Sequence, residues 1–228
     1  MQFCQKFDII AEVFLRKALT QTEFESEAMP KKVKPIDLSK RCGWCGDDPL
    51  YVKYHDEEWG RPILADDCKM FEFLVLESAQ AGLSWITILR KRENYRKTFA
   101  KFNAKKVAAF NDADVERLLL DPGIVRNRLK VNAAITNAKL FLELQAKHGS
   151  FCDYLRAFLP NGEPIVNHPK TLGDIPPRSE ISDVISKEMK KLGFKFFGTT
   201  ICYAHLQATG LINDHLEQCP FKYGDPFA

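Results

Sequence analysis

The sequence of 228 residues lacks any uninterrupted apolar run of the roughly 18–20 residues that a membrane-spanning helix needs. Its apolar N-terminal stretch, residues 7–19, is interrupted by two acids and two bases, Asp8, Glu12, Arg16 and Lys17. A secretory signal peptide has a continuous apolar core, so this stretch does not resemble one. We therefore expect a cytoplasmic protein that has no membrane as a partner.

The sequence also lacks a strong excess of charge of either sign, with 33 basic and 30 acidic side chains. This balance does not by itself indicate binding to nucleic acid. Residues 90–106 depart from it, because they contain a single acid, Glu93, among the bases Arg90, Lys91, Arg92, Arg96, Lys97, Lys101, Lys105 and Lys106. Such a segment either binds a phosphate backbone or forms a solvated helix face, and its charge alone does not distinguish these alternatives.

A disulfide framework is not expected either. The chain has seven cysteines, an odd number, and nothing that resembles a secretory signal. Free thiols in the core, together with a metal site, account better for this composition.

Period-2 alternation of apolar and polar residues is absent, as is any internal repeat. Helical periodicity and capping residues instead predict helices at 69–79, 84–99, 103–110, 113–120, 124–147, 179–191 and 199–208, with a loop-rich stretch from Pro160 to Pro177. We expect an all-α domain at residues 41–228. Residues 1–40 are expected to form a partly flexible N-terminal extension, with an amphipathic helix at 3–19 and an alternative start at Met29.

Four potential soft metal ligands lie in two distant pairs, Cys42 with His55 and His215 with Cys219. The spacing of the second pair places both side chains on one side of a helix or tight turn. Two thiolates and two imidazoles suit tetrahedral Zn²⁺ with no open position, which is a structural site. Buried thiols and hydrogen-bonded histidines are the alternative interpretation, and Cys45 competes with Cys42 as a ligand.

Cys42 and Cys45 also have the Cys-x-x-Cys spacing of thiol oxidoreductases. Those motifs usually open a helix directly after a strand, whereas Gly46-Asp-Asp-Pro49 follows here and no strand precedes. The spacing therefore gives only weak support to redox chemistry.

All three tryptophans of the chain, Trp44, Trp59 and Trp85, lie between residues 42 and 85, and Tyr51 and Tyr54 lie among them. Such rings either belong to the core or form a cage for a flat, electron-poor ligand. Glu77 follows the apolar residues Phe73 and Leu74 by one helical turn, so it lies on or beside an apolar face. A desolvated carboxylate among aromatic rings is typical of a functional site, although water or a structural arginine is an alternative partner for it.

Residues 192–200 (LGFKFFGTT) separate two predicted helices and indicate a hairpin. Gly193 and Gly198 allow backbone geometries closed to other residues, and Thr199 and Thr200 are candidate caps of the second helix. The free N–H groups of a helix N-terminus bind phosphate. The hairpin is therefore expected to hold a DNA backbone without reading bases, assisted by the lysines Lys190, Lys191 and Lys195.

Taken together, these segments resemble the bacterial 3-methyladenine DNA glycosylase I family, from Arg41 to Cys219. The resemblance is carried by residues 41–44 (RCGW), 49–51 (PLY), 54–56 (YHD), 58–60 (EWG), 76–77 (LE), 80–87 (QAGLSWIT), 91–95 (KRENY), 193–196 (GFKF), 198–203 (GTTICY) and 213–215 (NDH).

The resemblance implies a helix-hairpin-helix glycosylase fold with one structural zinc ion, bound by Cys42, His55, His215 and Cys219, that joins the two ends of the domain. It implies that Glu77 acts on the excised base and that the substrate-binding rings are Trp44, Tyr51, Tyr54, Trp59 and Trp85. It also implies that Gly82 and Leu83 enter the duplex as a wedge. Related hairpin glycosylases use an aspartate after the second hairpin helix, and the nearest one, Asp214, adjoins a zinc ligand and is not assigned to catalysis.

The implied activity is hydrolysis of the N-glycosidic bond of 3-methyladenine in double-stranded alkylated DNA, by base flipping and without strand cleavage. We expect the protein to act as a monomer. A zinc-stapled DNA-binding module without catalysis is the principal alternative, because it accounts for the hairpin and the basic segment but not for Glu77 among the rings.

Overall fold

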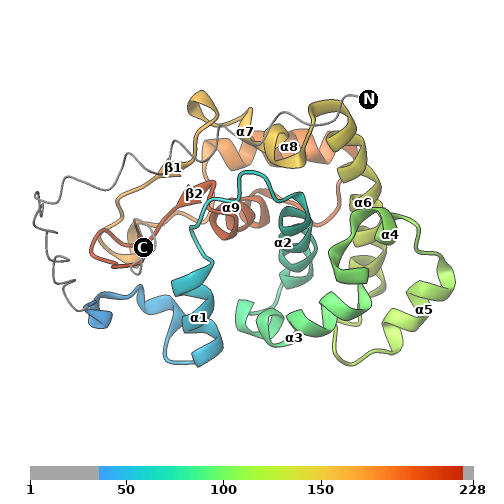
Figure 1. The fold of residues 1–228 in the computed structure, drawn as a ribbon, viewed down its shortest axis with the longest axis horizontal. Helices are drawn as coiled ribbons and strands as arrows, with labels where there is room; N and C mark the ends of the chain where they lie inside the picture. The colour runs from blue at the N-terminus through green and yellow to red at the C-terminus, as the bar shows by residue number, and fades with distance from the viewer. Residues whose placement is uncertain (1–35, 223–228) are drawn as a thin grey trace, which may run out of the picture. The chain divides into compact units, whose positions relative to one another are not determined.

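The computed structural model describes residues 36–222, and Figure 1 shows their arrangement. The predicted helix at 3–19, the alternative start at Met29 and most of the expected N-terminal extension lie outside the described residues.

The described part of the chain is mostly helical, as predicted. Its nine α-helices are α1 (Pro49–Glu57), α2 (Asp67–Gln80), α3 (Trp85–Thr98), α4 (Ala104–Ala108), α5 (Asp112–Leu120), α6 (Arg128–His148), α7 (Phe151–Arg156), α8 (Glu180–Leu192) and α9 (Thr199–Ala208). No helix within residues 36–222 has the length and apolar character needed to cross a bilayer.

The prediction of a purely α-helical domain is wrong in one detail. Strands β1 (Ile165–Val166) and β2 (Ile212–Asn213) pair in parallel, with Ile165 opposite Ile212. Each strand has only two residues, which is too short for a period-2 pattern to be visible in the sequence. The pair fixes the loop-rich stretch after α7 to the segment that follows α9 (Figure 1).

Helix α2 is central to the packing of the domain. Every residue from Met70 to Ala79 is buried, and the helix contacts α3, α6, α7 and α9. Figure 1 shows α9 on one side of α2 and α6 on the other. A helix that is surrounded by other helices buries its polar positions too. Glu77 is therefore held inside the protein by the position of its helix.

Two helices were not predicted because local capping, rather than apolar periodicity, defines them. Helix α1 begins at Pro49, and the Asp48 carboxylate accepts hydrogen bonds from the backbone N–H groups of Leu50 and Tyr51. Helix α7 begins after Ser150, whose side chain accepts from the backbone N–H of Asp153.

The predicted start of the long helix at residue 124 is wrong. Helix α6 begins at Arg128, because the Asn127 side chain caps it by accepting a hydrogen bond from the Lys130 N–H. The backbone N–H of Val125 donates instead to the Tyr95 hydroxyl, at 3.1 Å, in a loop that packs on α3.

Candidate functional site

A cavity of about 360 Å³ opens where α1, α2, α3 and α9 converge. Its lining contains every aromatic residue predicted for the substrate site and also Glu77. The lining residues are Trp44, Tyr51, Tyr54, Trp59, Glu77, Gln80, Trp85, Leu172, Ile175, Ala204 and Gln207. The sequence did not indicate the last four, which come from the loop before α8 and from α9, because they have no distinctive spacing.

The rings of this cavity pack edge to face rather than in a flat stack. The Trp44 indole lies 5.1 Å from the Tyr51 ring and 4.9 Å from the Trp59 ring, at interplanar angles of 64° and 70°. Tyr54 connects this group to Trp85, with ring centroids 5.4 Å apart. The edge-to-face contacts leave ring faces available to a planar ligand.

Glu77 is buried in this aromatic surrounding, with 2% of its surface exposed. Burial alone raises the pKa of its carboxyl group to about 8. Its Oε2 atom has no hydrogen-bond partner within residues 36–222, and the same holds for the indole nitrogens of Trp44 and Trp85. An acceptor and two donors, all on residues that line the cavity, are thus left for a polar ligand.

The one buried arginine within residues 36–222 does not pair with Glu77. Arg92, on α3, donates to Glu58 through both terminal nitrogens at 2.8 Å and to Glu72 through Nε at 2.6 Å. Arg96 also pairs with Glu72, and Arg90 with Asp48. The basic segment at 90–106 is therefore partly neutralised by acids within the fold, which favours the structural interpretation for its three arginines.

The Tyr54 phenol is fully buried beside Glu77. Burial, with a further contribution from the Glu77 carboxylate, raises the pKa of Tyr54 well above its ordinary value of 10.0. The phenol therefore stays protonated at neutral pH, so its O–H remains available as a donor.

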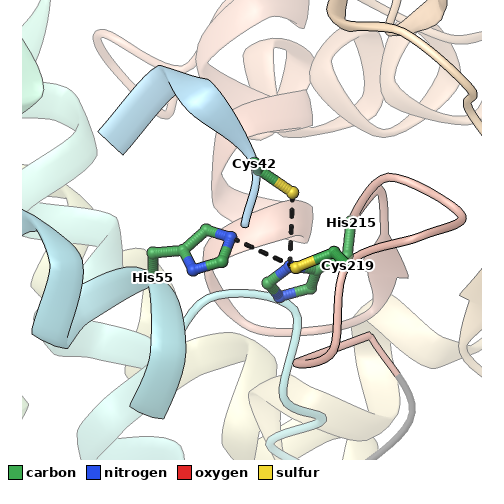
Figure 2. Close-up of side chains that lie close together, drawn as sticks. All are labelled: Cys42, His55, His215 and Cys219. Carbon is green, nitrogen blue, oxygen red and sulfur yellow. Dashed lines mark hydrogen bonds between the residues drawn. The ribbon is translucent and has the colours of Figure 1, made fainter. Parts of the chain in front are cut away.

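The four predicted metal ligands come together, although they are up to 177 positions apart in the chain. Figure 2 shows Cys42, His55, His215 and Cys219 pointing toward one centre. The ligand atoms all lie within 4.8 Å of one another, and all four residues are buried. Cys219 Sγ is 3.4 Å from His215 Nδ1 and 3.7 Å from His55 Nε2, and Cys42 Sγ is 3.6 Å from His215 Nδ1. This cluster could hold a metal ion.

Each imidazole of the cluster is oriented by a partner on its other nitrogen. His55 Nδ1 is 2.6 Å from the Asp56 carboxylate, and His215 Nε2 is 2.8 Å from the carbonyl oxygen of Trp59. Such contacts fix the ring tautomer of metal-binding histidines, leaving the second nitrogen as the ligand atom. Gly60 allows the close approach, because a Cβ atom there would lie 2.8 Å from the His215 ring.

Cys45 lies outside the cluster. Its thiol donates to the carbonyl oxygen of Cys42 at 3.2 Å, and burial raises its pKa. A buried thiol of raised pKa is a poor nucleophile. With Cys42 directed into the four-residue cluster, the geometry offers no support for a Cys42–Cys45 redox pair.

The metal cluster and the aromatic cavity share a wall. The Trp44 ring lies 5.2 Å from the His55 ring, and the Trp59 ring lies 4.6 Å from the His215 ring. Two of the cavity's three indoles therefore pack directly on metal-ligand candidates, so a shift of the imidazoles would move the cavity wall.

Asp214 is buried, and its carboxylate is fully engaged. It accepts hydrogen bonds from Tyr203 at 2.6 Å, Gln207 at 2.7 Å and Asn167 at 2.7 Å. Of these donors, Gln207 also lines the cavity. In this arrangement Asp214 orients Gln207, and the absence of a catalytic role for Asp214 stays a prediction.

The predicted hairpin joins α8 to α9 through residues 193–198. Gly193 has a φ of +103°, the left-handed geometry expected of it. For Gly198 the prediction is wrong, since its φ of −69° is open to any residue. Asn137 of α6 pins the loop, because its amide both accepts from the Lys195 N–H at 2.8 Å and donates to the Lys195 carbonyl at 2.9 Å. No pattern in the sequence indicates this role for Asn137.

The prediction that Thr199 and Thr200 cap α9 is wrong. Gly198 is the N-cap and supplies no side chain, and the Thr199 hydroxyl donates to Asp183 on α8 at 2.6 Å. Thr200 is exposed at the start of the helix. Lys191 forms a salt bridge with Glu188 at 2.6 Å, whereas Lys195 is exposed.

Gly82 and Leu83 form an exposed turn between α2 and α3, outside the cavity lining. Gly82 has a φ of +80°, and 41% of Leu83 is exposed. Gly82 and Leu83 follow Glu77 closely in the sequence, just after the end of α2. Gln80, the last residue of α2, lines the cavity.

Comparisons with known proteins agree on one family. A family model described as methyladenine glycosylase matches residues 44–223. The sequence is 51% identical over 180 residues to DNA-3-methyladenine glycosylase 1 of Escherichia coli, covering 79% of this chain and 95% of that protein. It is 43% identical over 185 residues to DNA-3-methyladenine glycosylase of Haemophilus influenzae, covering 81% and 99%. The solved structure of 3-methyladenine DNA glycosylase I from Staphylococcus aureus, described as the basis of 3-methyladenine recognition, superposes with a TM-score of 0.77 at 37% identity, covering 81% of this chain and 97% of that one.

Proposed function

The chain belongs to the methyladenine glycosylase family, and from this premise we propose that it is a DNA-repair hydrolase that releases 3-methyladenine from alkylated DNA. The observation that carries the proposal beyond family membership is the position of Glu77. An unpaired, buried carboxyl group in a cavity lined by three tryptophans is suited to a cationic, planar ligand.

Methylation at N3 leaves the adenine ring of the nucleotide positively charged. Aromatic faces attract such a ring, and Glu77, once ionised, provides both an opposite charge and a hydrogen-bond acceptor. Neutral adenine lacks the charge and therefore gains much less from the same cavity. We infer that Glu77 is the principal recognition group and that Trp44, Tyr51, Tyr54, Trp59 and Trp85 hold the base.

The positive charge also makes the base a good leaving group, so the enzyme has less barrier to lower than for a normal base. Release by water gives the free base and an abasic deoxyribose. The cavity lining contains no lysine that could act as an amine nucleophile. This composition supports a monofunctional glycosylase that does not cleave the strand.

We further propose that the cluster of Cys42, His55, His215 and Cys219 binds one structural zinc ion. Zn–S bonds of about 2.3 Å and Zn–N bonds of about 2.0–2.1 Å at tetrahedral angles give S···N edges of about 3.6 Å. The three S···N distances of 3.4, 3.6 and 3.7 Å fit these edges. With four protein ligands there is no open position for substrate, so the ion would stabilise the fold and the cavity wall.

DNA contact is proposed at two places. The α8–α9 hairpin presents Gly193, Lys195, Gly198 and Thr200, and α9 has no side chain capping its first turn, which supports binding of a backbone phosphate. Lys191 and Thr199 are bound within the fold and are expected to contribute less.

The exposed Gly82–Leu83 turn is proposed to enter the duplex and occupy the space left by the extruded base. An apolar side chain at the end of the helix that carries Glu77 supports this role. Extrusion costs a few kcal/mol, and it brings the lesion to the cavity. Action as a monomer stays a prediction.

The test is release of free base from methylated duplex DNA, followed by chromatography of the supernatant. We expect 3-methyladenine to be released with no strand breaks until the abasic sites are treated with alkali. A zinc-stapled binding module without catalysis would instead retain the DNA and release nothing, and that result would overturn the proposed function.

A further inference from the structure

Lys130, at the start of α6, reaches the C-terminal end of α2. Its Nζ donates to the carbonyl oxygen of Ala79 at 2.9 Å and to that of Ala81 at 2.6 Å. The last carbonyls of a helix have no partner within the helix, and a cation is favoured there by the helix dipole. The side chain is partly buried, and burial lowers its pKa, so an ammonium group at this position needs such acceptors.

Along the chain, the two carbonyls lie between residues that line the cavity and the exposed turn. Glu77 and Gln80 line the cavity on one side of them, and Gly82 and Leu83 follow on the other. A backbone hydrogen bond closes the turn itself, from the Leu83 N–H to the Gln80 carbonyl at 2.6 Å. Gly82, with its φ of +80° and open space around it, offers little resistance to a change of direction there.

We propose that Lys130 is a positioning residue for the reaction. It fixes the Gly82–Leu83 turn relative to Glu77, so that the base extruded when Leu83 enters the duplex is brought to Glu77. This inference rests on the proposed function. Lys130 is not among the residues that line the cavity, so it acts through α2 and the turn rather than on the base.

The test compares Lys130→Met, which keeps the length of the side chain and removes the ammonium, with Lys139→Met as a matched control. Lys139 is an exposed lysine on the same helix. We expect Lys130→Met to slow single-turnover release of 3-methyladenine from a paired duplex by about tenfold, the loss typical of a charge-assisted hydrogen bond. Affinity for free 3-methyladenine, measured by quenching of tryptophan fluorescence, should stay within about twofold of wild type, since the cavity is untouched.

A duplex with an abasic site opposite the lesion separates positioning from general destabilisation. Extrusion of an unpaired base costs less, so the defect of Lys130→Met should shrink on this substrate. The double variant Lys130→Met/Leu83→Ala should lose no more than Leu83→Ala alone, because both changes remove the same insertion step. If Lys130→Met is not folded at the assay temperature, Lys130→Gln, which removes the charge and keeps an amide NH₂ group as a donor, takes its place.

Three results would overturn the inference: release at the wild-type rate, an equal loss of free-base affinity, or a defect of the same size on paired and unpaired lesions. Failure of the wild-type protein to release 3-methyladenine would instead overturn the proposed function, so the two failures are distinguishable.

Discussion

At the residue scale, the chemistry of the site depends on one buried acid. Glu77 lies in a helix whose residues 70–79 are all buried, and no ion pair or hydrogen bond within residues 36–222 compensates its Oε2 atom. Burial raises the pKa of its carboxyl group to about 8, so the group stays mostly protonated at neutral pH when the cavity holds no cation. A cationic base favours the ionised form, so binding of the lesion is expected to release a proton.

The raised pKa of Glu77 predicts how the stability of the protein depends on pH. In the unfolded chain the carboxyl group has its ordinary pKa of 4.5, and in the folded protein the value is about 8. The folded state therefore holds the proton more tightly, and the stability that this provides is present below pH 4.5 and lost as pH rises through 8. Relative to Glu77→Gln, which does not titrate, the wild type should lose on the order of a few kcal/mol between these pH values.

Urea unfolding of both proteins at pH 5, 7 and 9 measures this difference directly. The comparison cancels the titration of all other groups, because the two proteins differ at one side chain. A constant difference across the series would show that Glu77 is not desolvated in the folded protein.

Single residues of the candidate site are predictable from the sequence where their side-chain chemistry is distinctive. Glu77, the five rings and the four metal-ligand candidates are all predicted from the sequence, and in the structure they form one cavity lining and one adjoining cluster. Gln207, Asn137 and Lys130 are not predicted, because glutamine, asparagine and lysine are common on helices. Only the tertiary contacts distinguish them from solvated side chains.

At the scale of elements, the loop between α8 and α9 is anchored to α6, since the Asn137 side chain binds the backbone of Lys195, and the Lys195 side chain is exposed. The sequence predicts both α8 and α9, but it wrongly predicts that Thr199 caps α9. The reason is that Thr199 has a better partner in Asp183 than in its own helix, and no sequence pattern reports a carboxylate from the facing helix.

Lys195→Ala should weaken binding to undamaged duplexes of any sequence to a similar extent. The loss of one phosphate contact should reduce the slope of log affinity against log salt by about 1. Fluorescence anisotropy at several salt concentrations gives both quantities.

The control for this prediction is Lys97→Ala, which removes an exposed lysine from the basic segment on α3. We expect it to leave the salt slope unchanged. The assignment of the hairpin as the DNA-binding element is contradicted if Lys97→Ala lowers the slope and Lys195→Ala does not.

At the scale of the whole domain, the Cys/His cluster connects the segment before α2 to the segment after α9. Cys42 and His55 precede the helical core, His215 and Cys219 follow it, and both imidazoles touch the indoles of the cavity. Binding of a metal to ligands so distant in the chain contributes its free energy to folding. The long-range closure was foreseen from ligand chemistry, whereas the parallel β1–β2 pair beside it was not.

We expect one zinc ion per chain, lost in Cys42→Ser and retained in Cys45→Ser. These cysteines are three positions apart and both buried, but only Cys42 belongs to the cluster. Elemental analysis and thermal unfolding check the prediction, and Cys42→Ser should melt several degrees lower, because several kcal/mol of binding energy are removed.

Equal zinc content in the two variants would exclude the assigned ligand set. Retained glycosylase activity in Cys45→Ser would at the same time dismiss a role for a Cys42–Cys45 redox pair.

The most direct measurement is single-turnover release of 3-methyladenine from one alkylated duplex by the wild type and by Glu77→Gln, with DNA affinity measured on the same samples. Glu143→Gln, which changes an exposed glutamate on α6, is the matched control. The account predicts that Glu77→Gln binds the duplex normally and releases the base at least about tenfold more slowly, since it cannot offer the cationic ring a carboxylate. Release at the wild-type rate would contradict it.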